Sequence, residues 1–244
     1  MDTQFTPEIN AKKKPFAFAS ITLIFTAFLV LGKALSPFLN SLSGRIPLSQ
    51  LVSVPNLVVH AFIILAILCV AAATFFKKSN LFLIISLFAV AIGFAVLAFF
   101  SVSSLIQVST YPNYPEEIRR GLIFSNVLYA AEEICFVLGF ITLGITAILA
   151  RMGKTKETNL WILASFFFLA AVIVGVAFVG KSLFGNFDYF VHKFQMLLKG
   201  WGSFTELFRT FLITFCPASI FFGNTVMNLI NSILLGTYLK KLSK

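Results

Sequence analysis

The sequence predicts an all-α protein: a polytopic membrane protein with a bundle of six transmembrane helices, both termini inside, and one external amphipathic interfacial helix. Three observations support this fold class. Hydrophobic residues make up 59% of the 244 residues and charged residues only 11%, whereas about 25% of a soluble domain is charged. Apolar runs reach the roughly 20 residues that cross a bilayer. Lysines and arginines punctuate the ends of these runs, as topology signals do.

We predict one membrane domain over residues 16–242, after a cytoplasmic tail over residues 1–15. The six apolar segments expected to span the membrane are 16–35, 56–76, 81–106, 122–150, 160–180 and 208–238. The first is read as a retained helix because its apolar stretch exceeds a signal-peptide core of about 7–15 residues. The inside then holds 11 Lys and Arg against 8 outside, and the inner bases lie in tails and short loops, where the positive-inside rule works best. The expected location is the plasma or inner membrane.

Two helix starts can be read from local signals. Pro115, followed by Glu116 and Glu117, predicts that the fourth helix begins above the membrane, because proline fits a first turn and acids complement the helix dipole. The sequence from Ser203 to Glu206 is a capping-box pattern that places the start of the sixth helix near Ser203. Pro217 then removes a backbone hydrogen bond inside that helix and is expected to kink it.

The external amphipathic helix is predicted over residues 187–199. Its apolar positions recur at helical spacing and its polar positions fall on the opposite face, at Asp188, His192, Gln195 and Lys199. Gly200 is suited to ending a helix. The simplest reading is a helix in the outer interface, with Trp201 at headgroup depth. The alternative is a lid packed over the external mouth of the bundle.

A pair of acids marks the fourth segment as a candidate site. Glu132 and Glu133 lie about ten residues into the span, or about 15 Å deep. Ionisable residues at such depth cost several kcal/mol and face the bundle interior or a wet cavity. Tyr129 lies one turn before both glutamates, and Asn126 one turn before Tyr129. The polar sector is therefore several residues wide.

Further polar positions come from other segments. Asn224, Asn228 and Asn231 form a ladder at i, i+4 and i+7 in the sixth segment, and intramembrane asparagines often hydrogen-bond across helices. Lys33 adds a candidate cation near the outer end of the first segment. His60 adds a titratable group near the outer end of the second segment.

These residues allow three functions. In the first, the protein is a small permease or a solute- or ion-binding protein, and the residues line a polar cavity that opens outward and binds a proton, a cation or a small polar solute. In the second, it is a structural, sensory or accessory subunit whose buried glutamates and asparagines are packing bonds, alongside a partner membrane subunit. The third, an intramembrane hydrolase, is the weakest. The glutamate pair matches two residues of the EExxxR motif of CAAX-type intramembrane proteases, but Val137 stands in place of the arginine.

Other classes are disfavoured by composition and motif content. The net charge of +10 is spread over helix ends and forms no patch for nucleic acid. The three cysteines lie in separate apolar runs, without the spacing of a metal site or a disulfide framework. We therefore expect the lipid bilayer as the main partner, with no cofactor and no metal.

Overall fold

The computed structural model describes residues 58–59, 61–66, 68–69, 80–110, 115–154 and 156–242. Four long helices carry most of this part of the chain: α4 (Asn80–Thr110), α5 (Glu116–Arg151), α6 (Leu160–Leu198) and α7 (Phe204–Leu242). A short 3-10 helix, η1 (Glu157–Asn159), leads into α6. The described residues contain no strand, so the all-helical prediction is confirmed for them.

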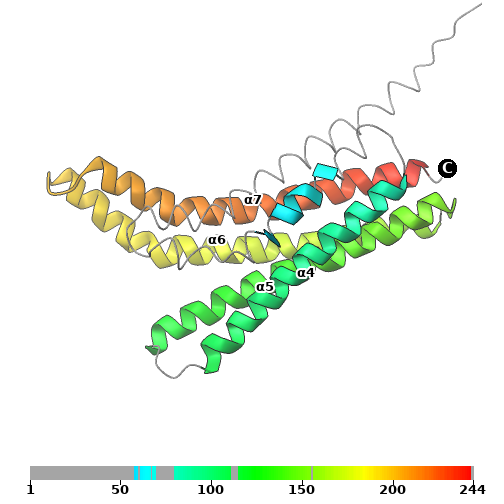
Figure 1. The fold of residues 1–244 in the computed structure, drawn as a ribbon. Coiled ribbons are helices and arrows are strands. Elements are labelled where there is room, and N and C mark those ends of the chain that lie inside the picture. The colour runs from blue at the N-terminus through cyan, green and yellow to red at the C-terminus, as the bar shows by residue number, and fades with distance from the viewer. Residues whose placement is uncertain are drawn as a thin grey trace, which may run out of the picture.

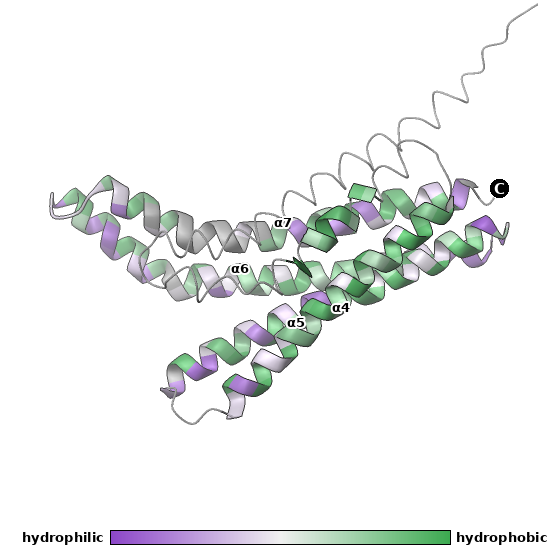
Figure 2. Ribbon diagram, viewed as in Figure 1, coloured by the Kyte–Doolittle hydropathy of each residue, from purple (hydrophilic) through white to green (hydrophobic). Residues whose placement is uncertain are grey.

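The four long helices form two antiparallel hairpins, α4–α5 and α6–α7, which cross each other (Figure 1). The α5–α6 turn joins the hairpins at the end where they lie together. Towards the opposite end, where the α4–α5 and α6–α7 connections lie, the two hairpins diverge (Figure 1). Hydrophilic residues gather towards the helix ends, apart from separate positions in the middle of α5 and α7 (Figure 2).

Three helices in the described part are long and apolar enough to cross a membrane: Leu81–Thr110, Ile118–Arg151 and Glu157–Gly185. They include the predicted third, fourth and fifth segments and extend beyond them by up to five residues at one or both ends. The predicted first segment, 16–35, lies outside the described residues. The second, 56–76, is described only at ten positions, all helical; there Ile63 is fully buried and fills the space beside Gly93. Six spans and the inside location of both termini therefore stay predictions.

The helix ends follow the local signals closely. Helix α5 begins at Glu116, and Pro115 is its N-cap. Because Pro115 was expected in the first turn, the helix begins one residue later than predicted. At the start of α7, the backbone N–H of Glu206 donates to Ser203 Oγ at 3.1 Å, as the capping-box pattern predicts. Gly200 has φ +74, and the N–H groups of Gly200 and Trp201 donate to Leu197 O and Met196 O at 3.0 and 2.9 Å. These bonds form the Schellman motif that ends α6.

The amphipathic segment 187–199 is not a separate helix, contrary to the prediction. It is the continuation of α6, which runs unbroken from Leu160 to Leu198. A break near residue 180 would leave backbone groups without helical partners. Gly180 and Gly185 each weaken a helix by only about 1 kcal/mol, and no proline lies between them, so the helix continues to Leu198.

Phenylalanine rings form the contact between the hairpins. Phe168 of α6 lies 5.9 Å from Phe136 and 5.1 Å from Phe140 of α5, measured between ring centroids. Phe94 of α4 packs on the same two rings at 4.8 and 5.9 Å. Gly139 makes room for this packing, because a Cβ there would lie 2.6 Å from Phe168 Cζ. This cluster holds α5 and α6 together one to two turns beyond the glutamate pair.

Candidate functional site

The glutamate pair lies inside the helix bundle. The exposed fraction is 0% for Glu132 and 4% for Glu133, although the two residues are adjacent on α5. Helix α4 supplies one contact, in which Ser101 Oγ donates a hydrogen bond to Glu133 Oε2 at 2.6 Å. Adjacent helical side chains diverge by about 100°, so burial of both requires neighbouring helices on two sides of α5.

Helix α7 contributes three buried asparagines. Asn224 and Asn228 are each 1% exposed and Asn231 is 4% exposed. Asn228 Nδ2 donates to the backbone oxygen of Asn224 at 3.0 Å and to Asn224 Oδ1 at 3.1 Å. These bonds fix the orientation of both amides. Asn224 Nδ2 and Asn228 Oδ1 are buried and make no hydrogen bond to any residue in the described part of the chain.

Aromatic contacts fix the depth of these residues relative to one another. The Tyr129 ring of α5 lies 5.4 Å from that of Phe221 on α7 and 5.1 Å from that of Phe178 on α6. Helices α5 and α7 run in the same direction because each is antiparallel to α6. Glu132 follows Tyr129 by three residues and Asn224 follows Phe221 by three residues. The carboxyl of Glu132 and the amide of Asn224 therefore originate at the same depth.

Helix α6 reaches this depth at Gly175. A Cβ at Gly175 would lie 2.8 Å from Oγ1 of Thr225, which is fully buried on α7. The glycine thus allows α6 and α7 to approach closely at the level of Asn224. Ser101, Glu132, Glu133, Gly175, Thr225, Asn224 and Asn228 together form what we call the polar layer, to which all four long helices contribute.

Lys181 is a further functional candidate, one not identified from the sequence. Its Nζ donates to the backbone oxygen of Gly121 at 2.7 Å and contacts Ser125 Oγ. The same ammonium lies 5.3 Å from the ring centroid of Phe124. Ser125 precedes Glu132 by seven residues, or about 10 Å along the helix. A lysine directly after an apolar run reads as a topology signal, and only the packing of α6 on α5 reveals its contacts.

The other predicted site residues are placed less fully. Asn126 and Tyr129 are half-buried on α5. Lys33 and His60 lie outside the described residues, so their relation to the polar layer is not tested. Among the residues that the structure describes, no group of three or more His, Cys, Asp or Glu side chains is arranged to hold a metal ion.

No protein-family model matches the chain, and no curated protein or solved structure matches it either. The class of the protein therefore rests on its own helices. Three of these helices are long and apolar, which is compatible with a membrane protein.

Proposed function

We propose that the protein is a small permease or a solute- or ion-binding membrane protein, and that Glu132 and Glu133 are its central binding groups. Its location would be the plasma or inner membrane. The observation that carries the proposal is the burial of two adjacent carboxyl groups in a helix that is long and apolar enough to span a membrane. Such groups are expensive at depth and in membrane proteins usually mark an ion or substrate path.

The amides of α7 support the same proposal. Asn228 Oδ1 is a buried acceptor and Asn224 Nδ2 is a buried donor, and neither is used by another described residue. Leaving such groups unsatisfied costs about 1–3 kcal/mol each. A bound water, cation or small polar solute would recover that free energy. The carboxyl groups add sites for a proton or a cation.

The path to the layer is proposed to open outward, as the sequence predicts. In the described part it would pass Lys181 and then the rings of Tyr129, Phe178 and Phe221, which lie between Lys181 and the glutamates. Asn126 and Asn231 would border the path above and below the polar layer. Lys33 and His60 remain proposed contributors from the first two segments.

A second candidate function is that of a structural or accessory membrane subunit. The bond from Ser101 to Glu133 favours it, because a carboxyl that joins α4 to α5 contributes to helix packing. In this case the protein would recognise a partner membrane subunit and not a solute. Hydrolysis within the membrane has no comparable support.

Flux measurements in liposomes separate the two candidates. The purified chain is reconstituted and the flux of protons, Na⁺ and K⁺ is measured for the native protein, Glu132→Gln and Glu133→Gln. We expect a flux for at least one of these ions that both variants reduce by about tenfold or more. Glu206→Gln is the matched control, since Glu206 is exposed at the start of α7, and should retain the flux. Folded glutamine variants with unchanged flux would support the structural role instead.

A further inference from the structure

The exposed apolar face of α6 is longer than a membrane is thick. It continues at helical spacing beyond the apolar span and ends only at Trp201, after the last turn. The exposed members are Ile162, Phe166, Leu169, Ile173, Val176, Leu183, Phe184, Phe187, Phe194, Leu198 and Trp201. At 1.5 Å per residue this face extends about 58 Å, against about 30 Å for the hydrocarbon core. A helix tilted by the usual 0–40° therefore carries the outer part of this face beyond the hydrocarbon.

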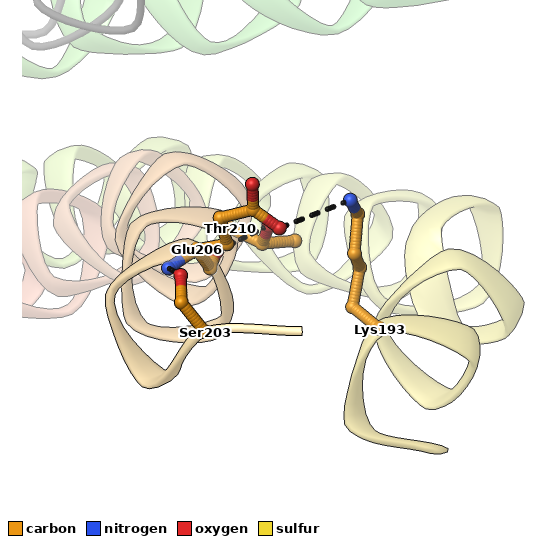
Figure 3. A network of polar contacts seen from close by, with 4 residues as sticks. All are labelled: Lys193, Ser203, Glu206 and Thr210. Atoms are coloured by element: carbon orange, nitrogen blue, oxygen red, sulfur yellow. Dashed lines mark hydrogen bonds and ion pairs between the residues drawn. The ribbon is translucent and has the colours of Figure 1, made fainter. Parts of the chain in front are cut away.

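The outer part belongs to a unit of two helices and their turn, which we call the distal arm: residues 183–211, from the last part of α6 through the turn to the start of α7. Phe190 packs against Phe211 with ring centroids 6.3 Å apart. Lys193 Nζ lies 3.5 Å from Glu206 Oε2 and joins the two helices near Ser203 and Thr210 (Figure 3). These contacts join the two helices of the arm.

The distal arm has two chemically different faces, and both are exposed. One face carries large apolar side chains, of which Phe184, Trp201 and Phe204 are 85%, 76% and 70% exposed. The other carries Asp188, His192, Gln195 and Lys199, all exposed. An arm surrounded by water would leave a large aromatic patch wet, and soluble surfaces rarely do so. An arm buried in hydrocarbon would place its charged side chains in a medium that does not solvate them.

We propose that the distal arm lies in the outer membrane–water interface, with its aromatic face in lipid and its polar face in water. Lipid is the occupant that fits, because the aromatic face of the arm directly continues the exposed apolar face of the α6 span. Tryptophan beside lysine is also the composition of interfacial segments. The proposal concerns membrane attachment and does not depend on what the polar layer binds.

Both helices are unbroken at the base of the arm, but each carries residue types there that lower helix rigidity. Phe178 faces Phe221 and Phe190 faces Phe211, so Pro217 of α7 lies opposite the stretch between Gly180 and Gly185 of α6. Proline removes a helical hydrogen bond, and glycine lowers helix rigidity. A Cβ at either glycine would meet no atom within 4 Å, so close packing does not require glycine there. Lys181 anchors α6 to α5 at this same level, and beyond it the α6–α7 hairpin curves away from α4–α5 (Figure 1).

Tryptophan fluorescence tests the proposal, because the chain has only two tryptophans. In Trp161→Phe, Trp201 is the single emitter. The full-length variant is reconstituted in phosphatidylcholine–phosphatidylglycerol vesicles that contain lipids brominated either near the glycerol end or near the middle of the acyl chain. Aqueous iodide is added in parallel. We expect stronger quenching by the shallow bromines than by the deep ones, and protection from iodide.

Paired variants control for indirect effects. Phe194→Glu places a charge on the apolar face, whereas Gln195→Glu places the same charge on the polar face one residue later. In the Trp161→Phe background, Phe194→Glu should reduce bromolipid quenching about twofold or more, and Gln195→Glu should leave it unchanged. Efficient iodide quenching without bromolipid quenching would overturn the proposal. Protection that disappears when the protein is diluted in lipid would also overturn it, because a second copy would then cover the arm.

Discussion

At the scale of single residues, the decisive contact is the one between Ser101 and Glu133. The serine hydroxyl reaches across from α4, and its 2.6 Å distance to the carboxyl oxygen is that of a strong hydrogen bond. This bond ties Glu133 of α5 to α4. The pair is therefore asymmetric in position: Glu133 accepts a hydrogen bond from α4, and Glu132 lies at the level of the α7 amides.

This asymmetry predicts a measurable coupling between Ser101 and Glu133. A double-mutant cycle of Ser101→Ala and Glu133→Gln, followed by thermal unfolding in detergent micelles, should give a coupling free energy of about 0.5–2 kcal/mol, the range of interhelical hydrogen bonds in membrane proteins. Ser109→Ala is the control, since Ser109 is exposed and bonds only to the backbone of its own helix. Additive effects of Ser101→Ala and Glu133→Gln would show that the bond contributes nothing to stability.

At the scale of helices, one glycine makes room for the contact between the two hairpins. Gly139 and Gly121 lie on the same helix, α5, but only Gly139 faces a neighbouring ring. Phe168 is fully buried between Phe136 and Phe140, so it has no free space into which it could withdraw from an added methyl group.

We therefore expect opposite effects of the same substitution at these two glycines. Gly139→Ala should lower the free energy of unfolding by about 1–3 kcal/mol because it overpacks the contact with Phe168. Gly121→Ala meets no atom within 4 Å and should leave stability unchanged or raise it by up to about 1 kcal/mol through helix propensity. Thermal unfolding midpoints compare the two. Equal midpoints would mean that α5 and α6 are not in tight contact at Gly139, and Phe168→Leu should partly rescue Gly139→Ala.

The sequence predicts the helices better than it predicts their contacts. Apolar length is a local property, and so are the proline before Glu116, the Ser203 cap and Gly200; each gave a helix or a helix end close to the observed position. The continuity of α6 through Gly185 was missed because a glycine weakens a helix without ending it. The contacts of Ser101 and Lys181 were missed because they depend on how neighbouring helices are aligned along their axes. The position of an apolar run in the sequence does not determine that alignment. The burial of the asparagine ladder on α7 agrees with the pattern, since three amides in an apolar run need an interior.

At the scale of the whole molecule, Lys181 is a polar link between the two hairpins. Its ammonium donates hydrogen bonds to Gly121 and Ser125 of α5. The distal arm begins two residues further along α6. The angle between the hairpins at this end therefore depends on a hydrogen-bonded cation as well as on packed rings.

Removing this cation should let the hairpins separate. Spin labels at Ile118 and Asp188, both exposed, report the separation by double electron–electron resonance in a background with the three native cysteines replaced by serine. Lys181→Met keeps the apolar stem and loses the ammonium, and we expect a longer or broader distance distribution. Lys193→Met is the matched control because Lys193 pairs with Glu206 inside the α6–α7 hairpin. Identical distance distributions for Lys181→Met and Lys193→Met would show that packing alone sets the angle between the hairpins.

The turn between α5 and α6 gives the molecule a further property. In the described part of the chain, residues 152–159 are the one covalent joint between the two hairpins; everything else that unites them is noncovalent. The protein thus resembles a heterodimer of helical hairpins fused in tandem, with a short tether that keeps their effective concentration high. Glu132 and Asn224 then lie at the same depth in different halves. A solute bound there would favour association of the halves by mass action, so occupancy of the polar layer and the rigidity of the whole assembly would rise together.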